Sequence, residues 1–180
     1  SADGRRIVFK IDAGDRCMGG FRATPGLYWL PASGGEPHFI VADGDAPRFA
    51  AHDTRIYFET LDYEGTQAVH RIQSVNLDGF DRRIHAVAKG ADILDLRLSP
   101  DLKHVTFRDR QQYYSMPYRE GGAPLEVGAS VGEMPVKALT SLGGYGLTWS
   151  ADSRTVYWLL GAALYSANVG DPGAGPADAA

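Results

Sequence analysis

The stretch "LSPDLKHVTFRDRQQYYSMPYREGG", residues 98–122, decides the fold. Its first part is a polar turn that leads into alternating apolar residues. Its second part is another run of β-forming residues, and it ends in a Gly-Gly turn. Alternation with a period of two is typical of a strand, and Gly-rich turns bound strands. The stretch therefore predicts two antiparallel strands, and similar stretches elsewhere would make it a repeat unit.

The polar turn and its strand occur four times along the chain. Each copy has an Asp in a short polar turn, then a basic residue, then alternating apolar positions that close on an aromatic ring. The copies are "SADGRRIVF" (1–9), "AHDTRIYF" (51–58), "SPDLKHVTF" (99–107) and "SADSRTVYW" (150–158). The closing aromatic residues are 49, 49 and 51 residues apart. A period of about 40–50 residues is typical of propellers and solenoids.

The repeated positions predict both the turn and the strand that follows it. An Asp in such a turn can accept a hydrogen bond from the backbone N–H two residues on. The residues in this position are Asp3, Asp53, Asp101 and Asp152. Apolar residues two apart share one face of a strand; they are Ile7/Phe9, Ile56/Phe58, Val105/Phe107 and Val156/Trp158. The opposite face carries Val8, Tyr57, Thr106 and Tyr157, which are also β-formers, so both faces are expected to be buried.

Further short strands complete each copy. A second strand is predicted in 27–35, 72–79, 113–122 and 164–170, and a third in 39–41, 83–87 and 125–127. Another precedes the Asp turn in 48–50, 94–98 and 147–149. Four short strands in hairpin order predict an all-β chain of antiparallel four-stranded blades of a β-propeller, about four blades of a larger propeller. The predicted blades are 1–42, 43–90, 91–128 and 129–169, and 170–180 is a Pro/Gly/Ala-rich linker or tail. A β-sandwich is the alternative.

Composition excludes several classes of function. The chain has 180 residues, of which 44% are hydrophobic and 22% charged, so it is long enough for a core of ordinary size. The net charge is −4, and basic residues cluster only in the pairs 5–6 and 82–83, so nucleic acid is not expected as a partner. Since no apolar run reaches about 18 residues, no membrane span is predicted. Cys17 is the single cysteine, so no intrachain disulfide can form.

The pattern S-x-D-x-x-x-V-x-F followed by "YYSMPYREGG" resembles the TolB-like propeller repeat across residues 1–169. The segments 74–85, 99–118 and 134–166, in that order, are similar to the propeller region of bacterial amidohydrolase-related proteins. The resemblance implies a non-catalytic segment that is a scaffold or access gate for a metal-dependent catalytic barrel outside this chain. It also implies a periplasmic or secreted hydrolase as the parent protein. A divalent metal such as zinc would lie in that catalytic domain, and no cofactor in this chain.

Two alternative functions remain open at this point. One is a TolB-like periplasmic protein-binding module, and the other is the propeller of a prolyl-oligopeptidase-like serine peptidase. The chain contains no G-x-S-x-G elbow, which a serine hydrolase needs for its nucleophile. Its histidines form neither His-x-His nor His-Glu-x-x-His; they are His38, His52, His70, His85 and His104. No catalytic, cofactor-binding or metal-binding residue is therefore predicted.

Long loops give the one prediction of a binding site. Residues 10–26, 59–71 and 128–144 are long connections, and long loops at one end of a rigid scaffold commonly carry binding residues. The predicted binding-face residues are Asp15, Arg16, Met18, Phe21, Tyr63 and Glu64.

The end copies each lack one strand of the pattern. The first copy lacks its innermost strand and the last its outermost, so each is expected to expose strand edges and an apolar face. These faces predict contact with other polypeptide, either the remainder of the parent chain or a second copy. The faces of Ile7 with Phe9 and of Val156 with Trp158 are the expected places of contact.

Overall fold

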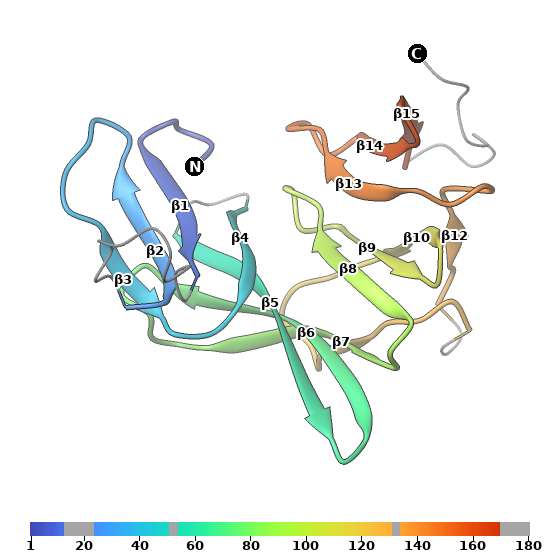
Figure 1. Ribbon diagram of the computed structural model, residues 1–180, viewed down its shortest axis with the longest axis horizontal. Helices are drawn as coiled ribbons and strands as arrows, with labels where there is room; N and C mark the ends of the chain where they lie inside the picture. Colours follow the sequence, from blue (N-terminus) through green and yellow to red (C-terminus); the bar gives the residue numbers. More distant parts are fainter. Residues whose placement is uncertain (13–23, 51–53, 131–133, 170–180) are drawn as a thin grey trace. The chain divides into compact units, whose positions relative to one another are not determined.

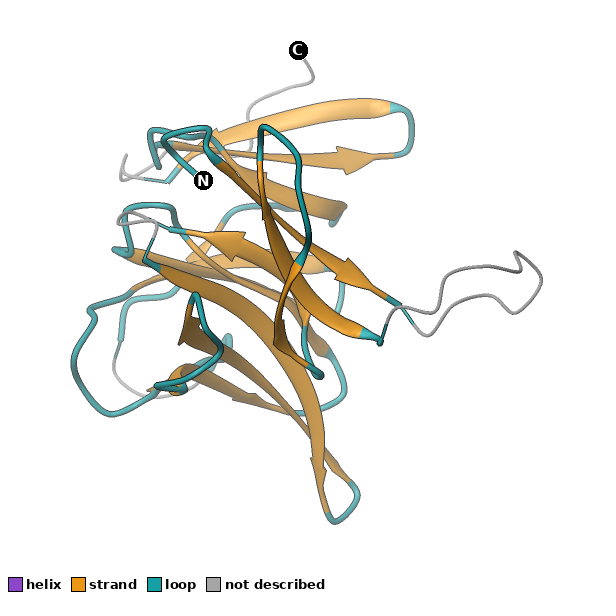
Figure 2. Cartoon of the chain, turned by 90° about the vertical axis from the view of Figure 1, so that its left-hand side faces the viewer, coloured by secondary structure: helices purple, strands orange, loops and turns teal. Residues whose placement is uncertain are grey.

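The computed structural model describes residues 1–12, 24–50, 54–130 and 134–169. Within these ranges the chain forms strands and turns without a helix (Figure 1, Figure 2). The predicted all-β class is confirmed. The described ranges also hold no helix that is long and apolar enough to cross a membrane.

The strands group into four sheets. Sheet 1 has the order β1-β2-β3, from β1 (Arg6–Ile11), β2 (Gly26–Pro31) and β3 (His38–Val41). Sheet 2 has the order β11-β7-β6-β5-β4, from β4 (Asp45–Phe49), β5 (Arg55–Glu64), β6 (Gln67–Asn76), β7 (Arg83–Lys89) and β11 (Leu125–Glu126). Sheet 3 has the order β12-β10-β9-β8, from β8 (Ile93–Leu98), β9 (His104–Asp109), β10 (Gln112–Pro117) and β12 (Lys137–Ala138). Sheet 4 has the order β13-β14-β15, from β13 (Tyr145–Trp149), β14 (Thr155–Leu160) and β15 (Ala163–Asn168).

The predicted Asp turns are confirmed in the copies that the structure describes. In each, the Asp carboxylate accepts a hydrogen bond from the backbone N–H two residues on. The bonds are Arg5 N to Asp3 at 2.9 Å, Lys103 N to Asp101 at 3.2 Å and Arg154 N to Asp152 at 3.1 Å. The residue after the Asp has a positive φ in each copy: Gly4 at 68°, Leu102 at 58° and Ser153 at 62°. Asp53 lies outside the described residues. One local geometry therefore recurs at the repeat spacing.

The strands that follow the turns bury the predicted face in three copies. Ile56, Phe58, Val105, Phe107, Val156 and Trp158 are all at most 2% exposed. In the first copy Ile7 is 50% exposed, whereas Tyr28 on the same face is 8% exposed, so this face of sheet 1 is only partly covered.

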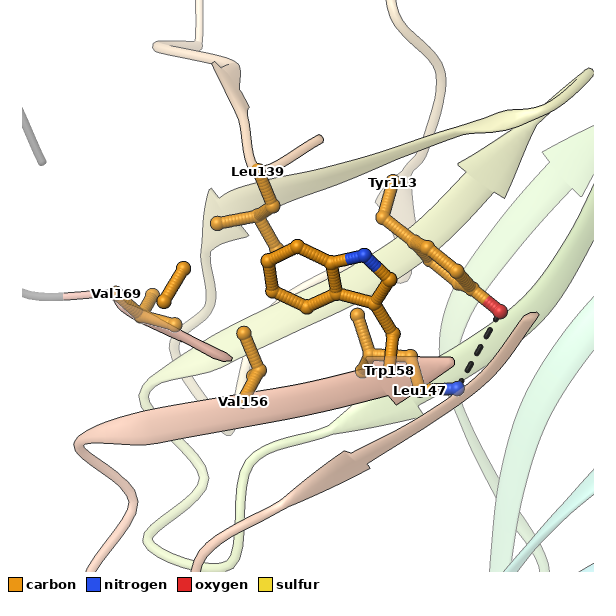
Figure 3. Packing of buried hydrophobic residues seen from close by; sticks show 7 residues of the cluster. Tyr113, Leu139, Leu147, Val156, Trp158 and Val169 are labelled. Atoms are coloured by element: carbon orange, nitrogen blue, oxygen red, sulfur yellow. Dashed lines mark hydrogen bonds between the residues drawn. The ribbon is translucent and has the colours of Figure 1, made fainter. Parts of the chain in front are cut away.

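The chain divides into two compact units, and each has its own core. The first unit contains residues 1–61 and 71–85. Its core joins Leu27, Ile40, Val41, Ile56, Phe58 and Val75, with Val8, Trp29, Phe49 and Leu77 packed against them. The second unit contains residues 62–70 and those from 86 onward. Its core joins Tyr113, Leu139, Leu147, Val156, Trp158, Ala167 and Val169, and Trp158 lies in its middle (Figure 3).

The structure corrects three details of the predicted fold. No closed propeller is found among the described residues, so the expected β-propeller is not supported. The strand predicted at 125–127 does not complete its own sheet: β11 pairs in parallel with β7, and β12 takes the outer place in sheet 3. The long loop predicted at 59–71 is instead a hairpin, because β5 and β6 extend to Glu64 and from Gln67 around a tight turn with Gly65 at a φ of 64°.

The expected exposed face in the last copy is also corrected. Val156 is fully buried and Trp158 is 2% exposed. Tyr113 of β10 and Leu139, next to β12, pack against them, so sheet 3 covers this face of sheet 4 (Figure 3). The uncovered face of sheet 4 is the opposite one.

Candidate functional site

Most of the predicted binding-face residues cannot be located. Asp15, Arg16, Met18 and Phe21 lie outside the described residues. Tyr63 and Glu64 lie at the end of β5, on a strand and not in a loop. Tyr63 is 68% exposed, and Glu64 Oε2 pairs with Lys89 Nζ at 3.4 Å. No prediction about a binding role for these six residues is tested.

An open groove of about 600 Å³ lies in the first unit. It is lined by Trp29 of β2, His38 and Phe39 of β3, Thr54, and Asn76, Leu77 and Asp78 at the end of β6. Its volume falls within the range of about 300–1,000 Å³ that is usual for small-molecule sites. An aromatic wall with a few polar groups is also the usual composition of such sites.

Aromatic stacking builds the wall of the groove. Trp29 and His38 are cross-strand partners, and their rings stack with centroids 4.3 Å apart and planes 17° apart. Trp29 Nε1 donates a hydrogen bond to the Leu77 carbonyl at 3.0 Å, which ties β2 to the segment after β6. Phe39 also borders the groove, but it is the cross-strand partner of Tyr28 and its ring packs against Tyr28, on the opposite face of the sheet from Trp29. The Arg6 guanidinium lies over the Trp29 ring at 5.6 Å from the centroid.

A tight turn places the polar side of the groove. The Asn76 side chain accepts a hydrogen bond from Phe80 N at 2.7 Å, and Gly79 N donates to the Asn76 carbonyl at 3.1 Å. Gly79 has a φ of 85°, and a Cβ at this residue would lie 2.2 Å from the Ile40 carbonyl oxygen. Only glycine fits this close approach to β3. The turn thereby holds Leu77 and Asp78 beside the aromatic wall.

Asp78 gives the groove its charge. An aspartate is ionised at neutral pH. Among the described residues, no basic side chain forms a salt bridge with Asp78; its carboxylate lies 3.4 Å from Phe80 N. The groove therefore places a carboxylate without a described salt-bridge partner beside aromatic rings. Both features attract cations.

A second polar cluster in the first unit is buried. Ser74 Oγ lies 2.7 Å from His85 Nε2, the distance of a nucleophile and its base. Ser74 is fully buried, however, and its Oγ also accepts a hydrogen bond from Arg55 Nε at 2.9 Å. A buried hydroxyl cannot reach a substrate. The cluster instead ties β5, β6 and β7 together in sheet 2.

Asp81 anchors the rim of this buried cluster. Its carboxylate pairs with Arg55 at 2.7 Å and with Arg83 at 2.6 Å. Hydrogen bonds from Arg83 and then Arg55 lower the pKa of Asp81. Both arginines are thus committed to a carboxylate of their own chain, and the cluster offers no open anion site.

The described residues contain no group of three or more His, Cys, Asp or Glu side chains that could hold a metal ion. His52 and Cys17 lie outside them. The groove was missed at the sequence level because its residues come from four separate segments. The one signal was "NLDGF" (76–80), a turn pattern that carries an Asp two residues before a Phe.

No family model and no curated protein matches the chain. One solved structure that resembles it is a Bacteroides uniformis protein that is provisionally assigned as a 6-phosphogluconolactonase. The two are 17% identical, with a TM-score of 0.49, over 98% of this chain and 54% of that one. The chain thus spans about half the length of this neighbour.

The comparisons correct the predicted family. Neither a family model nor a curated protein supports the TolB-like and amidohydrolase-related resemblance, and the solved structure named above is of another kind, so the predicted resemblance was wrong. The predicted role as a scaffold or access gate for an amidohydrolase barrel falls with it, as do the alternatives derived from the same resemblance. Function has to be argued from the site itself.

Proposed function

We propose that the chain is a binding protein whose groove in the first unit takes an organic cation. The observation that carries this proposal is the position of Asp78, a carboxylate without a described salt-bridge partner beside the aromatic wall. Ammonium and guanidinium groups gain about 0.5–2 kcal/mol over an aromatic face. The Arg6 guanidinium over Trp29 is an example of this contact at the same ring.

The polar residues of the groove would orient such a ligand. Thr54 is exposed and can donate or accept a hydrogen bond through its hydroxyl group. Asn76 is half-buried, and its carboxamide oxygen already accepts a hydrogen bond from Phe80 N. Its amide N–H groups therefore remain as hydrogen-bond donors for a ligand. A ligand with both a cationic group and a hydroxyl or carbonyl group matches this set of side chains.

Calorimetric titration with choline tests the proposal. Choline should bind, and its neutral isostere 3,3-dimethylbutan-1-ol should bind more weakly. Asp78→Asn should weaken choline binding about threefold to tenfold, which corresponds to roughly 0.7–1.4 kcal/mol. The matched control is Asp92→Asn, an exposed aspartate of the second unit, which should leave binding unchanged. Equal binding of choline and its isostere, or binding that is insensitive to Asp78→Asn, contradicts the proposal.

We propose that the four sheets are copies of one antiparallel unit, supported by the recurrence of the Asp turn with the same hydrogen bonds and the same positive φ. Stacked repeat units bury their faces against their neighbours, and the end units need a partner or a polar outer face. Other polypeptide is therefore the partner expected at the ends of the array.

A further inference from the structure

Each repeat sheet has two faces, which the repeat positions define. Face 1 carries the closing aromatic residue of each copy and the apolar residue two positions before it: Ile7/Phe9, Ile56/Phe58, Val105/Phe107 and Val156/Trp158. Face 2 carries the residues between them: Val8, Tyr57, Thr106 and Tyr157. Because side chains alternate along a strand, cross-strand partners share these faces.

The first unit shows how two such sheets pack. Trp29 is the cross-strand partner of Val8, so both lie on face 2 of sheet 1. They pack against Ile56 and Phe58, which lie on face 1 of sheet 2. Face 2 of one sheet therefore covers face 1 of the next.

The second unit repeats this arrangement. Tyr113 is the partner of Arg108 and lies on face 2 of sheet 3. It packs against Val156 and Trp158 on face 1 of sheet 4. Trp149 Nε1, from the same face of sheet 4, donates a hydrogen bond to Thr106 Oγ1 on face 2 of sheet 3 at 3.3 Å.

Face 1 of sheet 1 is partly exposed. Phe9 pairs with Tyr28, and Tyr28 with Phe39, so three aromatic rings form a row across the sheet. Their centroids are 5.9 Å and 5.3 Å apart. Tyr28 in the middle of the row is 8% exposed, whereas Phe39 at its end is 47% exposed and Ile7 beside the row is 50% exposed.

Face 2 of sheet 4 is also partly exposed. Tyr145 pairs with Leu159, and Leu159 with Leu164, so these three residues form a second apolar row. They are 49%, 37% and 47% exposed. Contiguous exposed apolar rows of this kind mark interaction surfaces.

We propose that face 2 of sheet 4 in one copy of this chain packs on face 1 of sheet 1 in a second copy. The two partly exposed faces are the two kinds that already pack on each other inside each unit. The interface would therefore continue one that the chain makes twice. Because the two faces differ, the contact is head-to-tail, and it adds further copies until a ring closes or a filament grows.

Two variants on different faces test the contact. Ile7→Glu blocks face 1 of sheet 1, and Leu159→Glu blocks face 2 of sheet 4. Both residues are exposed, so the substitutions should leave the fold intact, which circular dichroism can check. Leu142→Glu is the matched control, since Leu142 is 75% exposed and lies outside both rows.

Sedimentation velocity over a concentration series gives the readout. The wild-type chain and the Leu142→Glu variant should form assemblies that grow with concentration, and each blocked variant alone should be monomeric. A mixture of the two blocked variants should form a dimer and nothing larger, because one intact face remains on each partner.

A wild-type chain that is monomeric at high micromolar concentration overturns the proposal. Self-association of either blocked variant alone does so too, because it would require a contact between like faces.

Discussion

At the scale of single residues, a serine and an aspartate two positions apart fix the turn before each described repeat strand. The serine hydroxyl donates to the carboxylate at 2.6 Å in the first copy, 2.7 Å in the third and 2.6 Å in the fourth. The same hydroxyl oxygen accepts the backbone N–H five residues on, at 2.9, 3.0 and 3.0 Å. Side-chain bonds of this type satisfy donors that the turn leaves without a backbone partner.

Ser99 and Ser150 occupy the same place in this turn but differ in burial. Ser99 is fully buried and also accepts Lys103 N at 3.1 Å, whereas Ser150 is partly exposed. Ser99→Ala should therefore lower the free energy of unfolding by about 1–3 kcal/mol, the cost of leaving buried donors unsatisfied. Ser150→Ala should cost less, because water can replace its hydroxyl. Urea unfolding of both variants measures the difference, and equal losses would contradict this account.

The residues of the turn are where sequence reasoning is most reliable. Asp3, Asp101 and Asp152 make the predicted bonds because the interaction is local and depends on residues two positions apart. The sequence did not predict that Ile7 is exposed while Val156 is buried. Both follow the same strand pattern, and the neighbour that covers one and not the other is set by the tertiary structure.

At the scale of elements, the turn at residues 76–80 determines the shape of the groove. It joins β6 to β7 in sheet 2, while its Gly79 lies against β3 of sheet 1. Sequence alone identified the Asp-Gly turn but not its contact with Ile40, because 39 residues separate the two. Trp29 and Asp78 were missed as a pair for the same reason. Local turn chemistry was readable, whereas the juxtaposition of distant segments was not.

Alanine at two glycines separates backbone strain from close packing. Gly79 and Gly65 both have positive φ, at 85° and 64°, but a Cβ at Gly65 would meet nothing within 4 Å. Gly65→Ala should cost about 1 kcal/mol for the left-handed backbone. Gly79→Ala adds a clash with the Ile40 carbonyl and should cost roughly 2–4 kcal/mol. It should also weaken choline binding, since the turn carries Asp78. Thermal unfolding and calorimetry of both variants check this, and similar losses of stability would rule out the close approach.

Strand lengths show a second limit of sequence reasoning at this scale. The sequence pattern indicates a long connection at 59–71, between the strand that ends at Phe58 and the strand predicted from 72 onward. Leu61 and Tyr63 in this segment are exposed, at 50% and 68%. Strand pairing extends past the buried core, since backbone hydrogen bonds continue where side chains are exposed. The short β11 likewise pairs in parallel with β7, and no hydrophobic pattern distinguishes that partner from the antiparallel one.

At the scale of the whole molecule, the order of strands was predictable and their assembly was not. Sheets 1 and 4 have three strands each, and sheets 2 and 3 have more, as the missing strands of the end copies predicted. This follows from counting strands along the chain. The predictions of a β-propeller and of a TolB-like or amidohydrolase-related family were not supported, because many unrelated proteins contain repeated antiparallel sheets. The strand pattern alone does not fix how successive sheets are assembled.

The response of the molecule to acid follows from one buried histidine, His70, and one half-buried histidine, His104. Burial lowers the pKa of His70 in β6, and burial is also the main reason that the pKa of His104 in β9 is lowered. At a pH above about 6.5, the pKa of histidine in the unfolded chain, both side chains are neutral in the folded and in the unfolded chain. Their burial then has no effect on how the free energy of unfolding depends on pH. Below this pH the unfolded chain takes up protons that the folded chain resists, and the free energy of unfolding falls as pH falls.

Urea unfolding at about pH 7.5 and about pH 5.5 should therefore show a lower midpoint at the acidic pH, because this window lies across the ordinary histidine pKa. His70→Gln removes one of the two groups and should reduce the difference between the midpoints. His38→Gln is the control, because His38 is exposed at the groove and not in a core. If His70→Gln leaves the difference unchanged while His38→Gln reduces it, the acid sensitivity arises at the groove and not from the burial of His70.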